Sequence, residues 1–135
     1  MRFALTLLIL RLAACDTTSP EERVAGSYQA ERYAVTFQGD TADFLPVGGR
    51  FEMDLTADGR FTADIETPDV PEIEGDQSFA VTFDGTYALS GGDIVFFHSE
   101  DLFVRDLDWA TGNGTIRTSD SLSNGTQFDI VLRRG

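Results

Sequence analysis

The chain has 135 residues, of which 41 % are hydrophobic and 11 are Phe, and its 10 Arg against 23 Asp and Glu give a net charge of −13. This length and apolar content predict one domain with a buried core and exclude a disordered acidic chain. The charge argues against nucleic acid or anionic lipid as a partner of the folded surface, and a single Cys excludes a disulfide framework.

The first 14 residues have the pattern of a secretory signal peptide. A positive charge at Arg2 precedes the apolar run Phe3 to Leu10, which is too short to cross a bilayer. The segment ends in a motif that resembles the lipobox of bacterial lipoproteins, Leu12-Ala13-Ala14-Cys15. The resemblance implies that residues 1–14 are removed and that acyl chains on Cys15 hold the protein on a bacterial envelope membrane. An ordinary secretory signal followed by a coincidental Cys is the alternative.

Residues 15–23 are mostly polar and are predicted to form a tether, whereas residues 24–135 alternate between apolar and polar side chains with period two. The alternating runs are separated by Gly, Asp, Asn and Ser, which is typical of strands joined by turns. We predict eight strands, at residues 26–37, 49–56, 60–67, 78–89, 93–98, 102–109, 115–122 and 127–133. Short connections between them favour an all-β, eight-stranded antiparallel up-and-down barrel, with a β-sandwich as the alternative.

Two hairpins carry enough pattern to predict their register. Gly59 in the left-handed conformation places Leu55 opposite Phe61, so that the apolar side chains of both strands share a face. A two-residue turn at Gly91-Gly92 places Leu89 opposite Ile94. The same register places His98 on the inward face, opposite Gly85.

Three short motifs resemble small bacterial lipocalin-like domains. Residues 24–28 resemble the opening Gly-x-Trp of lipocalins with Tyr28 in place of Trp, residues 84–96 are similar to a Gly-Thr-Tyr hairpin motif, and residues 128–133 resemble the closing strand. The resemblance implies a barrel that holds a hydrophobic small molecule. In such a barrel the first long loop covers the open end, so Phe44, Leu45 and Val47 are candidates for a lid; the alternative is that they plug a filled barrel.

A second group of candidates is polar. In the strand predicted at 102–109, residues 103, 105, 107 and 109 lie on the same face. Because the other three are apolar and would face the interior, Arg105 is predicted to point inward beside His98. Together these two side chains are candidates for binding a carboxylate headgroup through charge-assisted hydrogen bonds. The alternative is that Arg105 extends to solvent or pairs with a surface acid.

The sequence predicts no enzyme, cofactor or metal site. A Ser–His–acid triad needs a nucleophile beside the single His, and no Gly-x-Ser-x-Gly elbow is present. One His and one Cys are too few for a zinc site. The acidic stretch from Asp64 to Asp76 lacks the spacing of a calcium loop, so we interpret it as a solvated hairpin loop.

Residues 94–97 and 102–104 are apolar on both faces of their predicted strands. On the outer face this predicts an exposed apolar patch, a candidate interface with a protein partner, made of Val95, Phe97, Leu102 and Val104. The sequence therefore leaves two functions open. One is a lipid-anchored barrel, at the periplasmic face or cell surface, that binds a small hydrophobic ligand; the other is a filled barrel that acts through contacts with another protein.

Overall fold

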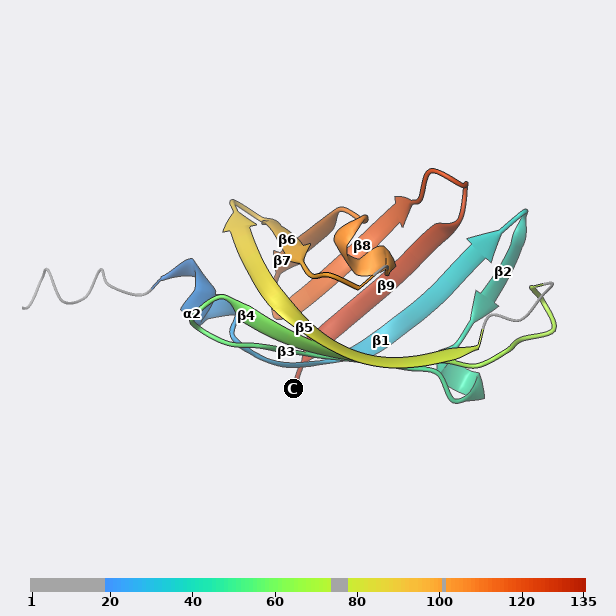
Figure 1. Ribbon diagram of the computed structural model, residues 1–135, viewed down its shortest axis with the longest axis horizontal. Helices are drawn as coiled ribbons and strands as arrows, with labels where there is room; N and C mark the ends of the chain where they lie inside the picture. Colours follow the sequence, from blue (N-terminus) through green and yellow to red (C-terminus); the bar gives the residue numbers. More distant parts are fainter. Residues whose placement is uncertain (1–18, 74–77, 101) are drawn as a thin grey trace, which may run out of the picture.

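Nine antiparallel strands form one sheet that curves until its ends meet (Figure 1). The computed structural model describes residues 19–73, 78–100 and 102–135. In chain order the strands are β1 (Gly26–Phe37), β2 (Asp40–Asp43), β3 (Arg50–Leu55), β4 (Arg60–Thr67), β5 (Phe79–Ser90), β6 (Asp93–Phe97), β7 (Trp109–Gly112), β8 (Thr115–Ser121) and β9 (Gln127–Arg134). The described helical turns are α2 (Pro20–Val24), η1 (Leu45–Val47) and η2 (Phe103–Arg105).

Eight of the strands make a closed up-and-down barrel, which confirms the predicted fold. Strands β3 to β8 each pair with the next along the chain, and β1 closes the circle by pairing with both β3 and β9. The additional strand β2 pairs with Ala34–Phe37 of β1 through a turn at Gln38 and Gly39, whose φ angles are 52° and 85°. The period-two pattern does not predict β2, because this strand is only four residues long and mostly polar.

Both predicted hairpin registers are confirmed. Leu55 lies opposite Phe61, and Gly59 between them has a φ of 86°. Leu89 lies opposite Ile94 across the turn at Gly91 and Gly92. In each hairpin the pairing buries apolar side chains on one face, because a shift of one residue would turn the whole set to solvent.

The strand predicted at 102–109 is wrong over most of its length. Residues 103–105 form η2, and β7 begins only at Trp109. Phe103, Val104 and Leu107 are all buried, a spacing that suits a helical turn and not a strand. The indole Nε1 of Trp109 donates a hydrogen bond of 2.9 Å to the carbonyl oxygen of Val104, which holds the turn against the strand that follows it.

This turn fills a side opening in the barrel. Only Asp93 and Ile94 of β6 pair with β7, and β5 joins the β6 ladder only from Thr86 onward. Within the described residues, the first half of β5 therefore pairs with β4 alone. Figure 1 shows η2 on the concave side of the curved sheet, where its side chains replace the missing backbone pairing with apolar contacts.

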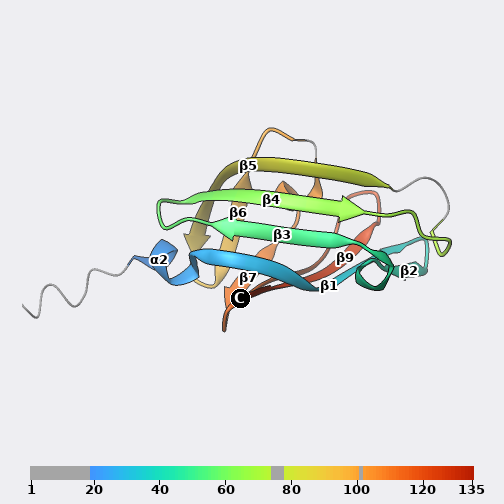
Figure 2. The same ribbon diagram turned by 90° about the horizontal axis from the view of Figure 1, so that it is seen from below.

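The N-terminal segment is attached to one end of the barrel. Residues 20–24, most of which belong to the predicted tether at 15–23, form α2, with Ser19 as its N-cap. The hydroxyl of Tyr28 donates to the carbonyl oxygen of Val24 at 2.6 Å, and Nη1 of Arg134 donates to that of Arg23 at 2.6 Å. Figure 2 shows that this α2 end lies opposite the end that carries β2. The predicted signal peptide and Cys15 lie outside the described residues.

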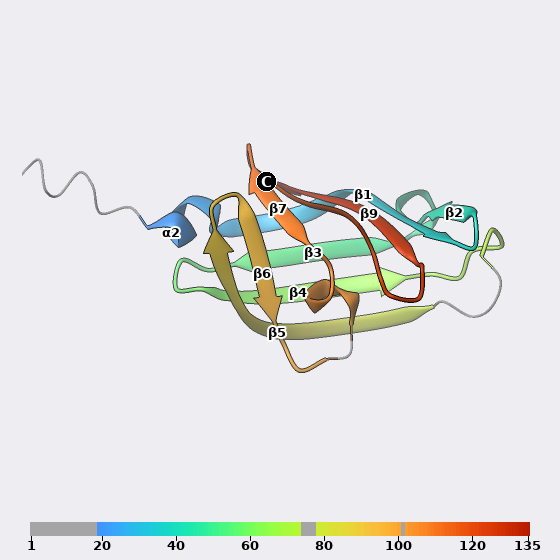
Figure 3. The same cartoon turned by 90° about the horizontal axis from the view of Figure 1, so that it is seen from above.

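Aromatic side chains fill the interior of the barrel between its two ends. Phe96 lies 5.0 Å from Phe61 and 5.8 Å from Trp109, measured between ring centroids. Trp109 in turn lies 6.2 Å from Phe51. Phe96 and Trp109 belong to β6 and β7, whereas Phe51 and Phe61 belong to β3 and β4. Figure 3, viewed from above, shows β6 and β7 crossing in front of β3 and β4. The interior is therefore packed from wall to wall at this level.

Candidate functional site

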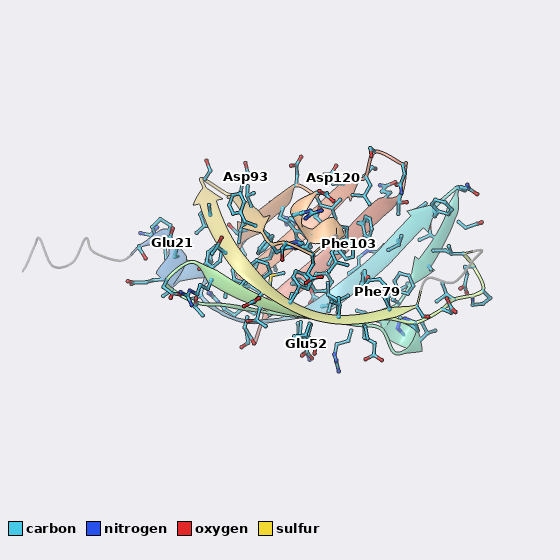
Figure 4. The ribbon with its side chains drawn as sticks, viewed as in Figure 1. Glu21, Glu52, Phe79, Asp93, Phe103 and Asp120 are labelled. Carbon is cyan, nitrogen blue, oxygen red and sulfur yellow. The ribbon has the colours of Figure 1, made fainter. Side chains whose placement is uncertain are left out.

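An apolar cavity of about 270 Å³ lies at the β2 end of the barrel. Its described lining contains no charged side chain and consists of Tyr33, Val35, Phe37, Phe44, Thr67, Ile73, Phe79, Phe103, Thr126 and Phe128. Figure 4 shows Phe79 and Phe103 toward the concave side of the sheet, whereas Glu52 projects from the convex side. A mainly apolar concave site with a few polar groups is the usual form of a small-molecule pocket.

Strand geometry brings the aromatic walls together. Tyr33, Val35 and Phe37 alternate along β1 and therefore point to the same face. Phe103 of η2 stacks on Phe128 of β9 with ring centroids 4.5 Å apart. Phe51 lies beneath, with its ring centroid 5.7 Å from that of Tyr33 and 6.1 Å from that of Phe103. Phe51 is fully buried and separates the cavity from the packed interior.

One polar pair is buried in this apolar surface. The hydroxyl of Tyr33 and Oγ1 of Thr67 are 2.8 Å apart and share a hydrogen bond. The two residues are only 1 % and 3 % exposed. Burial raises the pKa of Tyr33 to about 12, so its hydroxyl stays protonated at neutral pH.

The predicted lid residues occupy three different environments. Phe44 is buried and lines the cavity, with its ring centroid 5.0 Å from that of Tyr33. Leu45 is half-buried against the core, and Val47 is 55 % exposed and lies outside the cavity. The backbone N–H of Phe44 donates to the carbonyl oxygen of Tyr33 at 2.9 Å, so this part of the loop is fixed to β1.

The loop that follows β4 also reaches the cavity, although its sequence predicts only solvated acidic residues. Val70 and Ile73 are both buried, and Ile73 lines the cavity. The interpretation of 64–76 as a solvated loop is therefore wrong for these two residues. A signal was present in the sequence, because two branched apolar side chains interrupt an acidic stretch at Val70 and Ile73.

The two polar candidates, His98 and Arg105, do not line the cavity. The ring of His98 packs on the core with its centroid 4.7 Å from that of Phe83. Burial together with the charge of Arg105 lowers the pKa of His98. Arg105 is exposed, and its Nη1 donates to the carbonyl oxygen of His98 at 3.4 Å. The inward direction predicted for Arg105 is wrong because residues 103–105 are helical, so strand parity does not apply there.

The helical turn η2 divides the predicted apolar patch. Val95 and Phe97 on the outer face of β6 are 46 % and 54 % exposed. Val104 is fully buried and Leu102 is half-buried, because η2 turns this part of the chain toward the core. The exposed apolar surface on β6 is therefore smaller than predicted.

A larger hollow of about 540 Å³ lies on the outer face of β1, β3, β4 and β5. Its lining includes the acidic side chains Glu52, Asp54 and Asp64. Arg50 pairs with Asp64 at 2.9 Å, and both side chains are substantially exposed. This hollow belongs to the acidic outer surface of the barrel and offers less apolar surface to a ligand than the cavity at the β2 end does.

Within residues 19–73, 78–100 and 102–135, no helix is long and apolar enough to cross a membrane. In the same part of the chain, no three His, Cys, Asp or Glu side chains gather closely enough to hold a metal ion. Comparison of the chain with protein-family models, with curated proteins and with solved structures gave no match in any of the three.

Proposed function

We propose that this protein is a lipid-anchored bacterial envelope protein whose barrel binds a small hydrophobic molecule without catalysing a reaction. The observation that carries the binding proposal is the cavity at the β2 end, whose described lining is apolar except for three hydroxyl groups. The packed aromatic side chains beneath it restrict a ligand to this end of the barrel. The lipocalin-like motifs support the same proposal, because they imply a barrel that holds a hydrophobic ligand.

The size of the cavity suits a small ligand. A volume of about 270 Å³ lies just below the usual range of ligand pockets, so we expect one or two rings or a short chain. A two-ring ligand that buries about 250 Å² of apolar surface gains roughly 6 kcal/mol from burial, and the loss of translational and rotational freedom offsets part of this gain, so we expect a dissociation constant no tighter than tens of micromolar.

Phe79→Glu tests this proposal, because it places a charge in the wall of the cavity. We expect it to weaken binding of the neutral two-ring fluorophore 1-aminonaphthalene about tenfold or more, since an unpaired charge beside an apolar ligand is costly. Fluorescence titration of the purified full-length protein, with Cys15→Ser to prevent acylation, measures the effect.

Phe97→Glu is the matched control, because it makes the same change at an exposed Phe on the outer face of β6. We expect it to leave binding of the fluorophore unchanged. Equal affinities of the parent and both variants would contradict binding in this cavity.

A filled barrel that binds another protein is the second candidate function. It is favoured by two exposed large hydrophobic residues on one strand, Val95 and Phe97. A protein that binds no fluorophore, and whose state of association changes only with Phe97→Glu, would support this second candidate.

The anchoring proposal rests on the lipobox-like sequence at Cys15 and has a separate test. We expect the unaltered protein to sediment with envelope membranes when expressed in a bacterium that processes lipoproteins. Cys15→Ser should move most of it to the soluble fraction, because a single thiol carries the acyl chains. Immunoblotting of the two fractions measures the shift, and membrane association that persists in Cys15→Ser would overturn acylation as the anchor.

A further inference from the structure

The buried pair Tyr33–Thr67 has one more hydroxyl proton than its own hydrogen bond uses. Each hydroxyl carries one proton, and whichever residue donates in the 2.8 Å contact, the accepting hydroxyl keeps its own. Within the described part of the chain, neither side chain makes a further hydrogen bond. A buried hydroxyl donor is costly without an acceptor, so this pair favours a ligand that supplies one.

The surroundings of this pair disfavour a charged ligand. No charged side chain is among the described residues that line the cavity, so neither an anion nor a cation finds a partner there. Arg105, the side chain expected to bind a carboxylate, is exposed and lies outside the lining. The net charge of −13 further opposes an approaching anion.

We infer that the ligand is a neutral apolar molecule that carries a hydrogen-bond acceptor, such as a ketone or ester oxygen, which takes the remaining hydroxyl proton of Tyr33 or Thr67. This inference rests on the proposed function and specifies the class of ligand. It replaces the carboxylate expected from the sequence by an uncharged oxygen, because the described lining residues offer a hydroxyl donor and no cation.

Three naphthalene derivatives of similar size distinguish the effects of apolar contact, hydrogen bonding and charge. 2-Acetylnaphthalene has a hydrogen-bond acceptor, 2-ethylnaphthalene has none, and 2-naphthoate is an anion. Each is titrated into the full-length Cys15→Ser protein and into the same protein with Tyr33→Phe and Thr67→Val, which removes both hydroxyls with little change in shape. We expect the double variant to bind 2-acetylnaphthalene about tenfold more weakly and to bind 2-ethylnaphthalene within about twofold of the parent. The naphthoate should bind the parent at least about tenfold more weakly than the ketone does.

Thr126→Val is the matched control, because it removes another hydroxyl from the lining that is not part of the pair. We expect it to leave the affinity ratio of the ketone to the ethyl compound unchanged. Unaltered binding of 2-ethylnaphthalene by the double variant also shows that the variant has kept its fold.

Each failure has a distinct meaning. Unchanged binding of both neutral compounds by the double variant would overturn the role of the hydroxyl pair while leaving apolar binding intact. Tightest binding of the naphthoate would overturn the requirement for a neutral ligand. Absence of binding of all three compounds to the parent would overturn both this inference and the proposed function.

Discussion

Trp109→Ala is expected to reduce the free energy of unfolding by about 3–5 kcal/mol, a large share of the roughly 5–15 kcal/mol of an ordinary domain. The indole of Trp109 contacts the rings of Phe51 and Phe96 and donates to the carbonyl oxygen of Val104. Its removal leaves a cavity at the centre of the barrel and releases η2. Chemical denaturation followed by circular dichroism measures the loss, since the variant retains no tryptophan to report fluorescence.

Trp109→Phe separates the two contributions. It keeps an aromatic ring in the core but leaves the buried carbonyl of Val104 without its donor, so we expect a loss of about 1–3 kcal/mol from this bond together with some cavity cost. Because Phe103 of the same turn lines the ligand cavity, both variants should also weaken binding of the naphthalene compounds. A fully stable Trp109→Ala protein would contradict the packed interior described above.

Gly85→Ala is expected to cost about 2–3 kcal/mol, the upper part of the usual range for forcing an extra carbon into a filled site. A Cβ at Gly85 would lie 2.8 Å from Cε1 of Phe61 and still closer to the carbonyl oxygen of Phe97. Backbone atoms of β6 cannot move away without disturbing its ladder with β5, so the cost is steric. The midpoint of urea unfolding, compared with that of the parent, measures it.

Gly92→Ala is the matched control in the same hairpin. The nearest atom to a Cβ there is the carbonyl oxygen of Thr111 at 3.8 Å, an ordinary contact. We expect this variant to unfold within about 1 kcal/mol of the parent. If Gly85→Ala were equally harmless, the close approach of β5 and β6 at Phe97 would be wrong.

The barrel could be predicted from the segments in which apolar and polar residues alternate without interruption. In β3, β4, β5 and β6 one register turns the alternating apolar side chains of neighbouring strands to the same inner face, and this register is the one that forms. The strand predicted at 102–109 was wrong because apolar residues there occupy both odd and even positions. Such a segment fits a strand buried on both faces as well as a helical turn. Only the contact between Trp109 and Val104 distinguishes these, and it is not visible from spacing.

The cavity was harder to predict than the barrel. Phe44 was identified as a residue near the open end, and it does line the cavity. Tyr33 and Thr67 were not singled out, because their hydrogen bond joins residues 34 positions apart in sequence. Ile73 was hidden in an acidic loop, where composition suggested solvent exposure. Sites assembled from the ends of several strands depend on closure of the barrel, which local patterns do not specify.

The attachment of α2 to the barrel determines how an acylated protein would stand on its membrane. Cys15 lies four positions before Ser19, so the anchor would lie within about 14 Å of the α2 end even with the chain fully extended. The β2 end, with its cavity, would then lie on the side away from the lipid (Figure 2). A ligand would enter the cavity from the aqueous phase or be transferred from a second protein. The bilayer would hold the barrel in place without supplying the ligand.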